Sequence, residues 1–404
     1  MRKKYPIKIN FLTTTFPKFI GDSHAPWILN MAQRLYESGY EIQVITPSAY
    51  DLKDNEIFKN VKVCRFRYFI KNFERVAYGA NIPANLASSN SAKFIFPFFV
   101  IGFICAAFKS IKKTNIVHAQ FGYSGLFVAL AHILKKSKIP FFVSFYGKDI
   151  AQAKKFKFLY KFVFMRANLI FVLSKDMEKE LISAGCPENK IKIHHLGIDC
   201  REFNKNKYFC SRKQNHIHLL VVANFVRKKG IDKIISAFSL LDNFSHEVRL
   251  KIVGRGPLEN YLKNQVLNLG LREKVEFINN YELSNPRQYV IDSMSKADIF
   301  ILPGFFSKDD YGGTPIVLME AGAMELPCIT TMNAGNAEIV INSKTGIVLP
   351  NQDSIKIADA INYLIDNPQK RINYGLNARK YILKNFNLDK QIANQINYYM
   401  RFIN

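Results

Sequence analysis

Cysteine is scarce in this sequence and never occurs as a CxxC pair. The six cysteines are scattered over 404 residues, at Cys64, Cys105, Cys186, Cys200, Cys210 and Cys328. Structural zinc sites and secreted disulfide scaffolds need closer or denser cysteines, so neither class is expected. We expect reduced, mostly structural thiols and a cytoplasmic protein.

Hydrophobic runs long enough to span a membrane are also lacking, and only one run comes near that length. The start, MRKKYPIKINFLTTT, is basic, but its apolar part is too short and too polar for a signal peptide. One apolar run, Phe94–Phe108 (FIFPFFVIGFICAAF), lies between Lys93 and Lys109. As a helix it would extend roughly 22 Å, short of the ~30 Å hydrocarbon core, and its proline and glycine weaken a spanning helix further. It is either a buried core helix or an anchor in the membrane interface.

Acidic residues are few relative to basic ones. Lys and Arg number 57 against 32 Asp and Glu, a net charge of +25, and residues 1–200 hold +17 of it (30 − 13). Nucleic acid and anionic lipid are the obvious attractors, but no nucleic-acid-binding module is visible, so nucleic acid is not expected. A second stretch of the same half, Lys154–Arg166 (KKFKFLYKFVFMR), mixes five cations with five aromatics. This coincidence favours an anionic membrane surface as a partner.

Strand and helix patterns alternate along both halves of the chain. The first half reads as strands at Ile7–Thr13, Glu41–Thr46, Asn115–Ala119, Phe141–Phe145, Leu169–Leu173 and Ile191–His194. After a polar stretch at 197–215, a plausible linker, strands follow at Leu219–Val222, Leu250–Val253, Val275–Ile278, Ile299–Leu302 and Cys328–Thr331, with a mostly helical tail. Alternation of this kind over this length predicts two α/β domains, each with a parallel sheet covered by helices on both faces.

Ligands of such sheets bind at the carboxyl ends of the strands, which directs attention to the residues there. In the first half these are His118, Tyr146, Gly147, Lys148, Asp149 and Ser174, and Gly21 lies near the end of the loop after the first strand. Each alone is more often structural, and an isolated histidine such as His118 is more often a core residue. In the second half, Lys228 and Lys229 follow one strand, and the Gly254–Gly256 turn follows the next.

The stretch Asp309–Glu338 (DDYGGTPIVLMEAGAMELPCITTMNAGNAE) is the most informative. A buried strand leads into Gly312 and Gly313, and the following Pro315 suits the first turn of a helix. Ile316, Val317, Met319 and Ala323 should face the core, and the helix should end before Pro327. Such a turn presents unpaired N–H groups to an anion, and Glu320 could accept from ribose hydroxyls. The pattern predicts a nucleotide-diphosphate site, although an ordinary β-α-β unit with a surface glutamate is the alternative.

These pieces together resemble the retaining GT-B glycosyltransferases of family 4 across nearly the whole chain. The similarity is carried by FPKFIGD, IVHAQF, SFYGKDI, FVLSKDMEKELISAGCPENKIKIHHLGID, NFVRKKGID, IVGRGPLENYL and GGTPIVLMEAGAMELP. The forms are most similar to bacterial transferases for exopolysaccharide, capsule or lipopolysaccharide. The resemblance implies two Rossmann-like domains whose parallel sheets face a central cleft. It implies an N-terminal acceptor domain (1–200), a C-terminal nucleotide-sugar domain (201–384) and a last helix (385–404) that crosses back.

The resemblance also assigns roles by position. Glu320 corresponds to the glutamate that holds the ribose, and Lys229 to the lysine that neutralises the diphosphate. The same comparison puts the other donor contacts at Asn224, Arg227, Lys228, Gly254, Asn279, Asp310, Gly312, Gly313, Thr314, Pro315 and Ile316. Gly21, His118, Tyr146, Gly147 and Asp149 fall on the acceptor side of the cleft.

Three positions depart from the family pattern. The first glutamate of its E-x7-E motif falls at Gly312, for which Asp309 or Asp310 could substitute. The arginine that partners the lysine falls at Asn224, with Arg227 or Lys228 as stand-ins, and the histidine of the HG motif is Tyr146. These departures motivate the alternative of a degenerate GT-B protein that binds a sugar nucleotide or a partner enzyme without turnover.

The expected chemistry is transfer of a hexosyl unit with retention at the anomeric carbon. Negative charge grows on the departing diphosphate, and cations with a helix N-terminus suit that demand without a metal. We therefore expect no metal and no cofactor beyond the nucleotide-sugar co-substrate. The acceptor is expected to be a glycan or a lipid-linked sugar, met by a protein that is peripheral on the inner face of the cell membrane.

Overall fold

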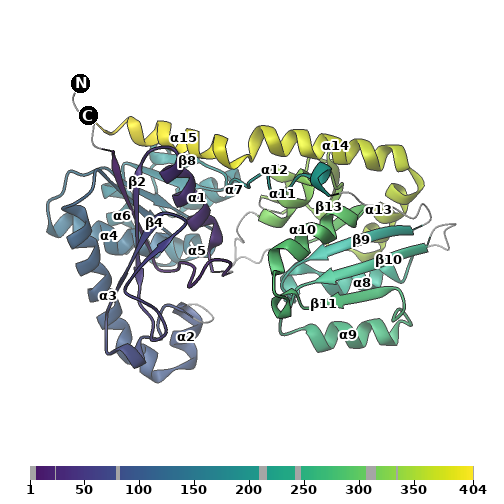
Figure 1. Ribbon diagram of the computed structural model, residues 1–404, viewed down its shortest axis with the longest axis horizontal. Coiled ribbons are helices and arrows are strands. Elements are labelled where there is room, and N and C mark those ends of the chain that lie inside the picture. The colour runs from purple at the N-terminus through teal and green to yellow at the C-terminus, as the bar shows by residue number, and fades with distance from the viewer. Residues whose placement is uncertain are drawn as a thin grey trace. The chain divides into compact units, whose positions relative to one another are not determined.

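Two separate sheets of mostly parallel strands dominate the computed structural model of this protein (Figure 1). The structure describes residues 6–22, 24–78, 82–208, 216–241, 247–305, 315–333 and 335–403. Unit 1 consists of residues 1–195 and 391–404, and unit 2 of residues 196–390. Each unit is an α/β layer structure, so the predicted fold class is confirmed.

The sheet of unit 1 has eight strands in the order β3-β4-β2-β1-β5-β6-β7-β8. Their bounds are β1 Lys8–Thr13, β2 Glu41–Pro47, β3 Asn55–Phe58, β4 Val61–Phe66, β5 Ile116–Gln120, β6 Phe141–Ser144, β7 Leu169–Val172 and β8 Ile191–Ile193. Neighbouring strands pair in parallel except β3, which is antiparallel to β4. The hairpin turn between them is made by Lys59 and Asn60, both at positive φ. Sequence reasoning missed β3 and β4.

Helices cover both faces of this sheet. They are α1 Pro26–Glu37, α2 Ile82–Ser88, α3 Asn90–Ile111, α4 Gly122–Leu134, α5 Lys148–Lys155, α6 Lys157–Arg166, α7 Lys175–Ser183 and α15 Leu388–Met400. Helix α4 packs against both α3 and α6, so these three form one layer (Figure 1). From the tail, the Tyr399 ring of α15 packs edge-on against His118 of β5 and lies beside Phe142 of β6. The last helix is therefore a structural part of unit 1 from Gln391 onward.

Helix α3 is longer than its apolar run predicts. Its 22 residues include Pro97 in their interior and correspond to about 33 Å at 1.5 Å per residue. By length and composition it is a helix that could cross a membrane, and one third of its apolar window is buried within unit 1. Phe99 and Phe103, one turn apart, are fully buried against the sheet. One side of α3 is therefore core, and its opposite side is not.

Unit 2 has six parallel strands in the order β11-β10-β9-β12-β13-β14. Their bounds are β9 His216–Val222, β10 Glu247–Val253, β11 Val275–Ile278, β12 Ile299–Leu302, β13 Cys328–Thr331 and β14 Gly346–Leu349. Five match the predicted strands closely, and β14 was missed. Numbered within the unit, the order is 3-2-1-4-5-6, that of the dinucleotide-binding folds.

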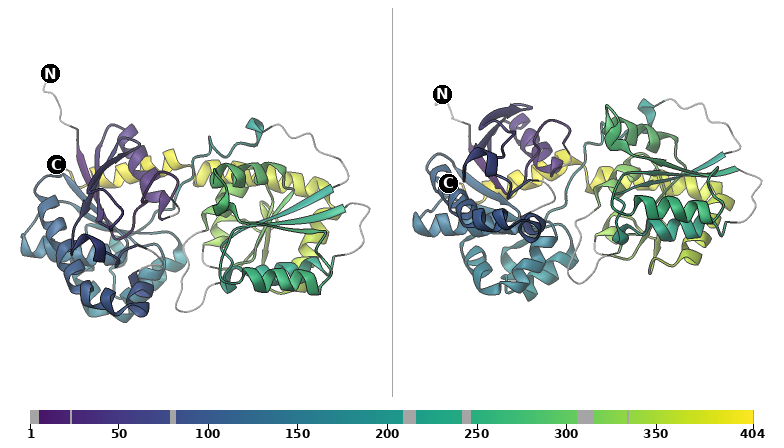
Figure 2. Two further views of the ribbon diagram at one scale, coloured as in Figure 1. Left: turned by 60° about the horizontal axis from the view of Figure 1, so that its bottom comes forward. Right: turned by 90° about the horizontal axis from the view of Figure 1, so that it is seen from below.

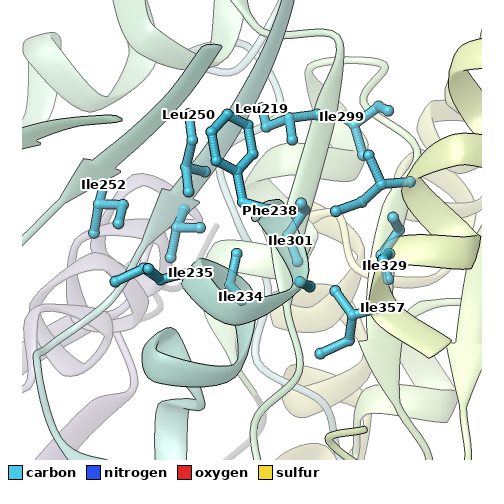
Figure 3. Packing of buried hydrophobic residues seen from close by; sticks show 14 of the residues in the cluster. Leu219, Ile234, Ile235, Phe238, Leu250, Ile252, Ile299, Ile301, Ile329 and Ile357 are labelled. Carbon is cyan, nitrogen blue, oxygen red and sulfur yellow. The ribbon is translucent and has the colours of Figure 1, made fainter. Parts of the chain in front are cut away.

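The sheet of unit 2 lies between two layers of helices, as Figure 2 shows from two sides. The helices are α8 Ile231–Phe238, α9 Glu259–Asn268, α10 Pro286–Lys296, α11 Ile316–Ala323, α12 Asn336–Ile339, α13 Ser354–Asp366 and α14 Pro368–Asn385. Alternate strand residues enter opposite cores. Ile299 and Ile301 pack with α8, α9 and α13 (Figure 3), whereas Phe300 and Leu302 pack with α10, α11 and α14. Near-continuous apolar strands are therefore required, as in buried parallel sheets generally.

The predicted linker is only partly a linker. Residues 196–208 belong to unit 2, where Ile198, Cys200 and Phe203 are buried. The backbone of Ile198 is bonded to Phe386 and Leu388 near the end of the chain. Residues 209–215 lie outside the described residues. The apolar residues Ile198, Cys200 and Phe203 within GIDCREF are the signal that distinguishes a packed segment from a free linker.

Candidate functional site

The topology of unit 2 directs attention to the space between the ends of β9 and β12. The strand order reverses there, because successive connections run outward from this pair in opposite directions. In open parallel sheets of this kind, ligands bind outside the carboxyl ends of the strands at such a switch point. The loop after β9 carries Arg227, Lys228 and Lys229, and the chain after β12 leads to the start of α11.

Two glycines allow the loops after β9 and β10 to lie in contact. A Cβ at Gly254, which has φ +148°, would meet the carbonyl oxygen of Ala223 at 2.0 Å. A Cβ at Gly256 would lie 2.6 to 2.8 Å from backbone atoms of Phe225. The Phe225 N–H donates to the carbonyl oxygen of Arg255 at 2.8 Å. The GxG turn is therefore needed for backbone packing at this edge of the sheet, whatever binds there.

Hydrogen bonds join the loops after β9, β12 and β13. The Phe305 N–H donates to the carbonyl oxygen of Lys228 at 2.9 Å. The Gly304 carbonyl accepts from the side chains of Thr331 and Asn333. The loop after β14 joins through Gln352, which donates to the carbonyl of Pro303. These contacts hold the basic turn after β9 in a defined place beside the end of β12.

The basic turn itself is a short 3-10 helix, Arg227–Lys229 (η4), closed by Gly230 in the left-handed conformation. Asn224 and Arg227 are exposed, and Lys228 and Lys229 are half-buried. The turn follows β9 at the switch point and leads directly into α8. Its three residues bring three cationic side chains to this place. Asn279, one of the predicted donor contacts, follows β11 directly and donates to the Glu282 carboxylate at 2.5 Å.

Helix α11 begins where predicted, with Pro315 at its N-cap and Ile316 as its first residue. Its inward face differs from the prediction in one respect. Ile316 and Val317 are only half-buried, whereas Leu318, Met319 and Ala323 are fully buried. Asp309, Asp310, Gly312, Gly313 and Thr314 lie outside the described residues.

Glu320 is buried on α11 and is held by an arginine that sequence reasoning did not single out. Its Oε1 accepts from Arg287 of α10 at 3.1 Å, and it is only 8% exposed. Arg287 also binds Glu202 through Nε at 2.6 Å and Nη2 at 2.8 Å. Burial raises the pKa of the Glu320 carboxyl, and the Arg287 charge acts against that rise. No pattern in the sequence connects these three residues, because they come from distant segments.

In unit 1, the predicted residues after β6 form one backbone clamp. The buried Asp149 carboxylate accepts from the N–H groups of Gly122, Tyr146 and Gly147 at 2.9 to 3.2 Å. This ties the end of β6 to the start of α4. The Tyr146 hydroxyl donates to Gln120 at 2.5 Å, and its ring lies against Phe121. The Asp149 carboxylate thus organises the strand ends, and Gly147 is needed at φ +131°.

The other two predicted residues of unit 1 lie apart from this clamp. Gly21 is exposed in the loop after β1, at φ +98°. His118 lies inside the fold and is fully buried. Its Nδ1 lies 2.5 Å from the Tyr399 hydroxyl and its Nε2 lies 2.8 Å from Ser144 Oγ. Burial lowers the pKa of His118 to about 3, so the ring is neutral and joins β5 and β6 to α15.

Among the described residues, no group of three His, Cys, Asp or Glu side chains is arranged to hold a metal ion. The five cysteines in that part of the chain are free thiols, three of them buried. The described part of the unit 2 site offers a ligand the cations of the turn after β9, the backbone N–H groups at the start of α11 and the Glu320 carboxylate.

Two family models match consecutive parts of the chain. Residues 26–202 match the model described as glycosyltransferase family 4, and residues 203–381 match glycosyl transferases group 1. The amylovoran biosynthesis glycosyltransferase AmsK of Erwinia amylovora is 25% identical over 409 residues, which cover 94% of this chain and 96% of AmsK.

Solved structures share the architecture. A glycosyltransferase from Rickettsia africae superimposes with a TM-score of 0.72 at 17% identity, over 98% of this chain and 99% of that one. The Anabaena protein HepE, crystallised with UDP, has a TM-score of 0.70 at 17% identity, over 97% of this chain and 100% of HepE. At this identity the similarity concerns the fold alone.

Proposed function

This chain belongs to the GT-B glycosyltransferases of family 4, and from that membership we propose that it moves a hexosyl unit from a nucleotide-sugar to a glycan or lipid-linked acceptor. We place this reaction in the synthesis of a bacterial surface polysaccharide, with retention at the anomeric carbon. AmsK, similar over nearly its whole length, is named as a glycosyltransferase of amylovoran biosynthesis. HepE, similar in fold, was crystallised with UDP.

The observation that carries the proposal is the basic turn at the switch point of unit 2. Arg227, Lys228 and Lys229 follow β9, and α11 begins after the neighbouring β12. Bond cleavage at the anomeric carbon leaves negative charge on the diphosphate. Cations and helix N–H groups fixed before the reaction stabilise that charge without reorganising. We assign Lys229 to the diphosphate and Glu320 to the ribose hydroxyls.

A thermal-shift panel of UDP-, GDP-, ADP- and TDP-sugars tests this assignment. A ligand present at about 100 times its Kd stabilises the folded protein by about 2.7 kcal/mol. We expect one nucleotide class to raise the melting temperature of wild type and to do so less for Lys229→Ala. Lys233→Ala is the matched control, because Lys233 is exposed on α8 only four residues along. Equal shifts in all three proteins would remove Lys229 from the donor site.

We also propose that the protein meets a lipid-linked acceptor at an anionic membrane surface. The surface concerned is the outer side of the layer α3, α4 and α6. On α3, Phe94, Phe98 and Ile101 recur at helical spacing and are 68%, 43% and 59% exposed. They lie opposite the buried face of the same helix, so the apolar run has two distinct sides. Monomeric soluble proteins rarely expose a continuous apolar stripe of this kind.

Two further segments of unit 1 also expose large apolar side chains. The turn at 69–73 adds Ile70 and Phe73, which are 65% and 52% exposed, and the Phe69 ring lies 5.2 Å from Phe98. On α6, Phe158 is 75% exposed and pairs with Phe162 at 5.8 Å. We call the exposed residues Ile70, Phe73, Phe94, Phe98, Ile101 and Phe158 the aromatic surface. They come from three separate parts of the sequence.

Exposed lysines on α3, α5 and α6 carry the charge that anionic headgroups require. Each cation near such headgroups contributes about 1 kcal/mol, so four contribute about 4 kcal/mol, and salt weakens the attraction. Not every lysine of Lys154–Arg166 is suited to this role. Lys154 forms an ion pair with Glu180 at 2.5 Å, and Lys157 donates to the carbonyl of Ser183 at 2.9 Å. Both therefore support the fold.

A charge-reversal variant at exposed lysines tests the membrane proposal. The changed positions are Lys93, Lys109, Lys155 and Lys161. Glutamate there should release the protein from phosphatidylglycerol vesicles at low salt. A matched control reverses four exposed lysines of unit 2, namely Lys274, Lys296, Lys356 and Lys370. The control should still bind. Wild type that does not sediment with these vesicles would end the membrane proposal while leaving the transferase proposal intact.

A further inference from the structure

Arg287 is a residue of unit 2 that the assigned donor contacts do not include. It is the second residue of α10, and its guanidinium faces two carboxylates from different segments. The Nε and Nη2 atoms form a two-point contact with Glu202, and Nη1 reaches Glu320 at 3.1 Å. The guanidinium also lies 4.8 Å from the ring centre of the buried Phe203. Three partners therefore fix the plane and direction of this side chain.

The two carboxylates differ in their surroundings. Glu320 is buried on the inner side of α11, whereas the Glu202 side chain is 36% exposed. Burial away from water raises the free energy of an ionised carboxylate unless a cation or N–H donors replace the water. Arg287 is the cation that the structure provides for Glu320. A planar guanidinium held by a two-point contact on one edge points its remaining N–H groups in a set direction.

We propose that Arg287 is a positioning residue that keeps the Glu320 carboxylate ionised and oriented for the ribose of a nucleotide, with Glu202 anchoring Arg287. This inference rests on the proposed function, which assigns Glu320 to the ribose. The contact with Arg287 is made by Oε1, and Oε2 is the atom assigned to a ribose hydroxyl. Arg287 acts through Glu320 and does not touch the nucleotide.

The charged groups around Glu320 predict how its pKa responds to the loss of Arg287 or of the Glu202 charge. Arg287 lowers the pKa of Glu320 and Glu202 raises it, both acting on a value already raised by burial. On α14, which packs against α11, Arg379 instead approaches Glu325 at 3.7 Å and donates to the carbonyl of Ala323. Loss of Arg287 should therefore raise the pKa of Glu320 further, whereas Glu202→Gln should not raise it through charge.

The titration of Glu320 tests the positioning role without any ligand. Carbon-13 carboxyl NMR of the full chain, with Glu320 assigned by its loss in Glu320→Gln, follows this group in wild type and in Arg287→Met. Methionine keeps an apolar side chain of similar reach but removes the charge. We expect the Glu320 midpoint to move to higher pH in Arg287→Met and to return toward wild type in Arg287→Lys. An unchanged midpoint in Arg287→Met would overturn the proposal.

Calorimetric titration with UDP and with GDP tests the consequence for binding. In Arg287→Met we expect the nucleotide affinity to fall about tenfold near pH 7, the scale for a hydrogen bond to a charged group. The affinity should recover as pH rises, because the ionised carboxylate is the acceptor and higher pH restores it. Wild type should show no such recovery. In a Glu320→Gln background, Arg287→Met should add little, since residues acting through one contact are not additive.

The outcomes separate this inference from the function on which it rests. Wild type that binds neither nucleotide contradicts the proposed donor site, and the NMR midpoint still decides the role of Arg287. A loss of affinity in Arg287→Met that is independent of pH and persists in the Glu320→Gln background would mean that Arg287 contacts the nucleotide itself. That result would overturn the proposal as well.

Discussion

Phe98 and Phe99 are neighbours on α3, and their substitution separates the core side of this helix from its outer side. Phe99 is fully buried, with the ring of Tyr68 at 5.1 Å, whereas Phe98 is 43% exposed. Phe99→Ala should lower the free energy of unfolding of unit 1 by about 3–5 kcal/mol, the cost of removing a buried phenylalanine ring. Phe98→Ala should lower it by only about 1 kcal/mol, because nearly half of the ring is already in water.

Vesicle binding should be weakened by Phe98→Ala and not by Phe99→Ala, the opposite of the order expected for stability. The exposed 43% of Phe98 corresponds to roughly 90 Å² of a ring side chain that buries about 200 Å² in full. Transfer of that area out of water contributes about 2 kcal/mol, so Phe98→Ala should weaken binding to phosphatidylglycerol vesicles about thirtyfold. Folded Phe99→Ala protein should bind vesicles as wild type does, because Phe99 does not reach the outer surface.

Two measurements on each variant decide whether α3 has a core side and a membrane-facing side. Trp27 of α1 is the single tryptophan of the sequence and lies in unit 1, so its fluorescence during urea unfolding reports on that unit. Sedimentation with vesicles gives the binding constant. Similar destabilisation by both substitutions, with vesicle binding unchanged, would show that all of α3 is core. Phe99→Ala protein of wild-type stability would show that α3 does not pack on the sheet.

Three further predictions concern other parts of the chain. Gly256→Ala should weaken nucleotide binding and destabilise unit 2 by about 1–3 kcal/mol, because its Cβ would lie 2.6 Å from the Phe225 backbone. Gly304→Ala, whose Cβ would lie 3.5 Å from the nearest atom, is the control, and equal effects would contradict the steric reason. The stability of unit 1 should fall as pH drops below about 6.5, by up to about 1.4 kcal/mol per pH unit for each buried histidine. The sign follows because burial lowers the pKa of His118 to about 3, so below the unfolded pKa only the unfolded chain takes up the proton. His118→Gln should flatten this slope in urea unfolding followed at Trp27, and an unchanged slope would show that His118 does not contribute to it. Alanine at whichever of Asp309 and Asp310 replaces the missing glutamate should raise the donor KM and reduce sugar selectivity, and unchanged kinetics in both variants would mean that the sugar hydroxyls are recognised elsewhere.

The fold was predictable from the sequence because the strands are buried on both faces. Ile299–Leu302 and Val275–Ile278 are strands with the predicted bounds, since uninterrupted apolar runs ended by turn residues have few other structures available. The strands that were missed have a different character. In β4, Val61, Val63 and Arg65 alternate with more exposed residues, and a buried arginine does not look like a core residue in the sequence. Its guanidinium is held by Glu56, Tyr78 and the carbonyl of Pro17.

The candidate site was predictable only where residues are close in the sequence. The basic turn before Gly230 and the start of α11 at Ile316 follow from local patterns, and the structure has both. The partners of Glu320 were not predictable, because Glu202 and Arg287 lie 118 and 33 positions away and only the folded chain joins them. His118 shows the same limit in unit 1. Its position in a strand was read correctly, but its partner Tyr399 lies at the far end of the chain.

The proposed function depends most on whether the basic turn of unit 2 supports sugar transfer. Release of nucleoside diphosphate from UDP-, GDP-, ADP- and TDP-sugars, measured with wild type and with Lys229→Ala, tests this most directly. We predict release from one nucleotide-sugar class by wild type, and a kcat lower by roughly 10²–10³ in Lys229→Ala, the scale for losing one preorganised electrostatic partner. Wild type that binds a nucleotide-sugar and releases no product would instead identify a GT-B protein without turnover. Lys229→Ala protein within about threefold of the wild-type kcat would contradict the role of the basic turn.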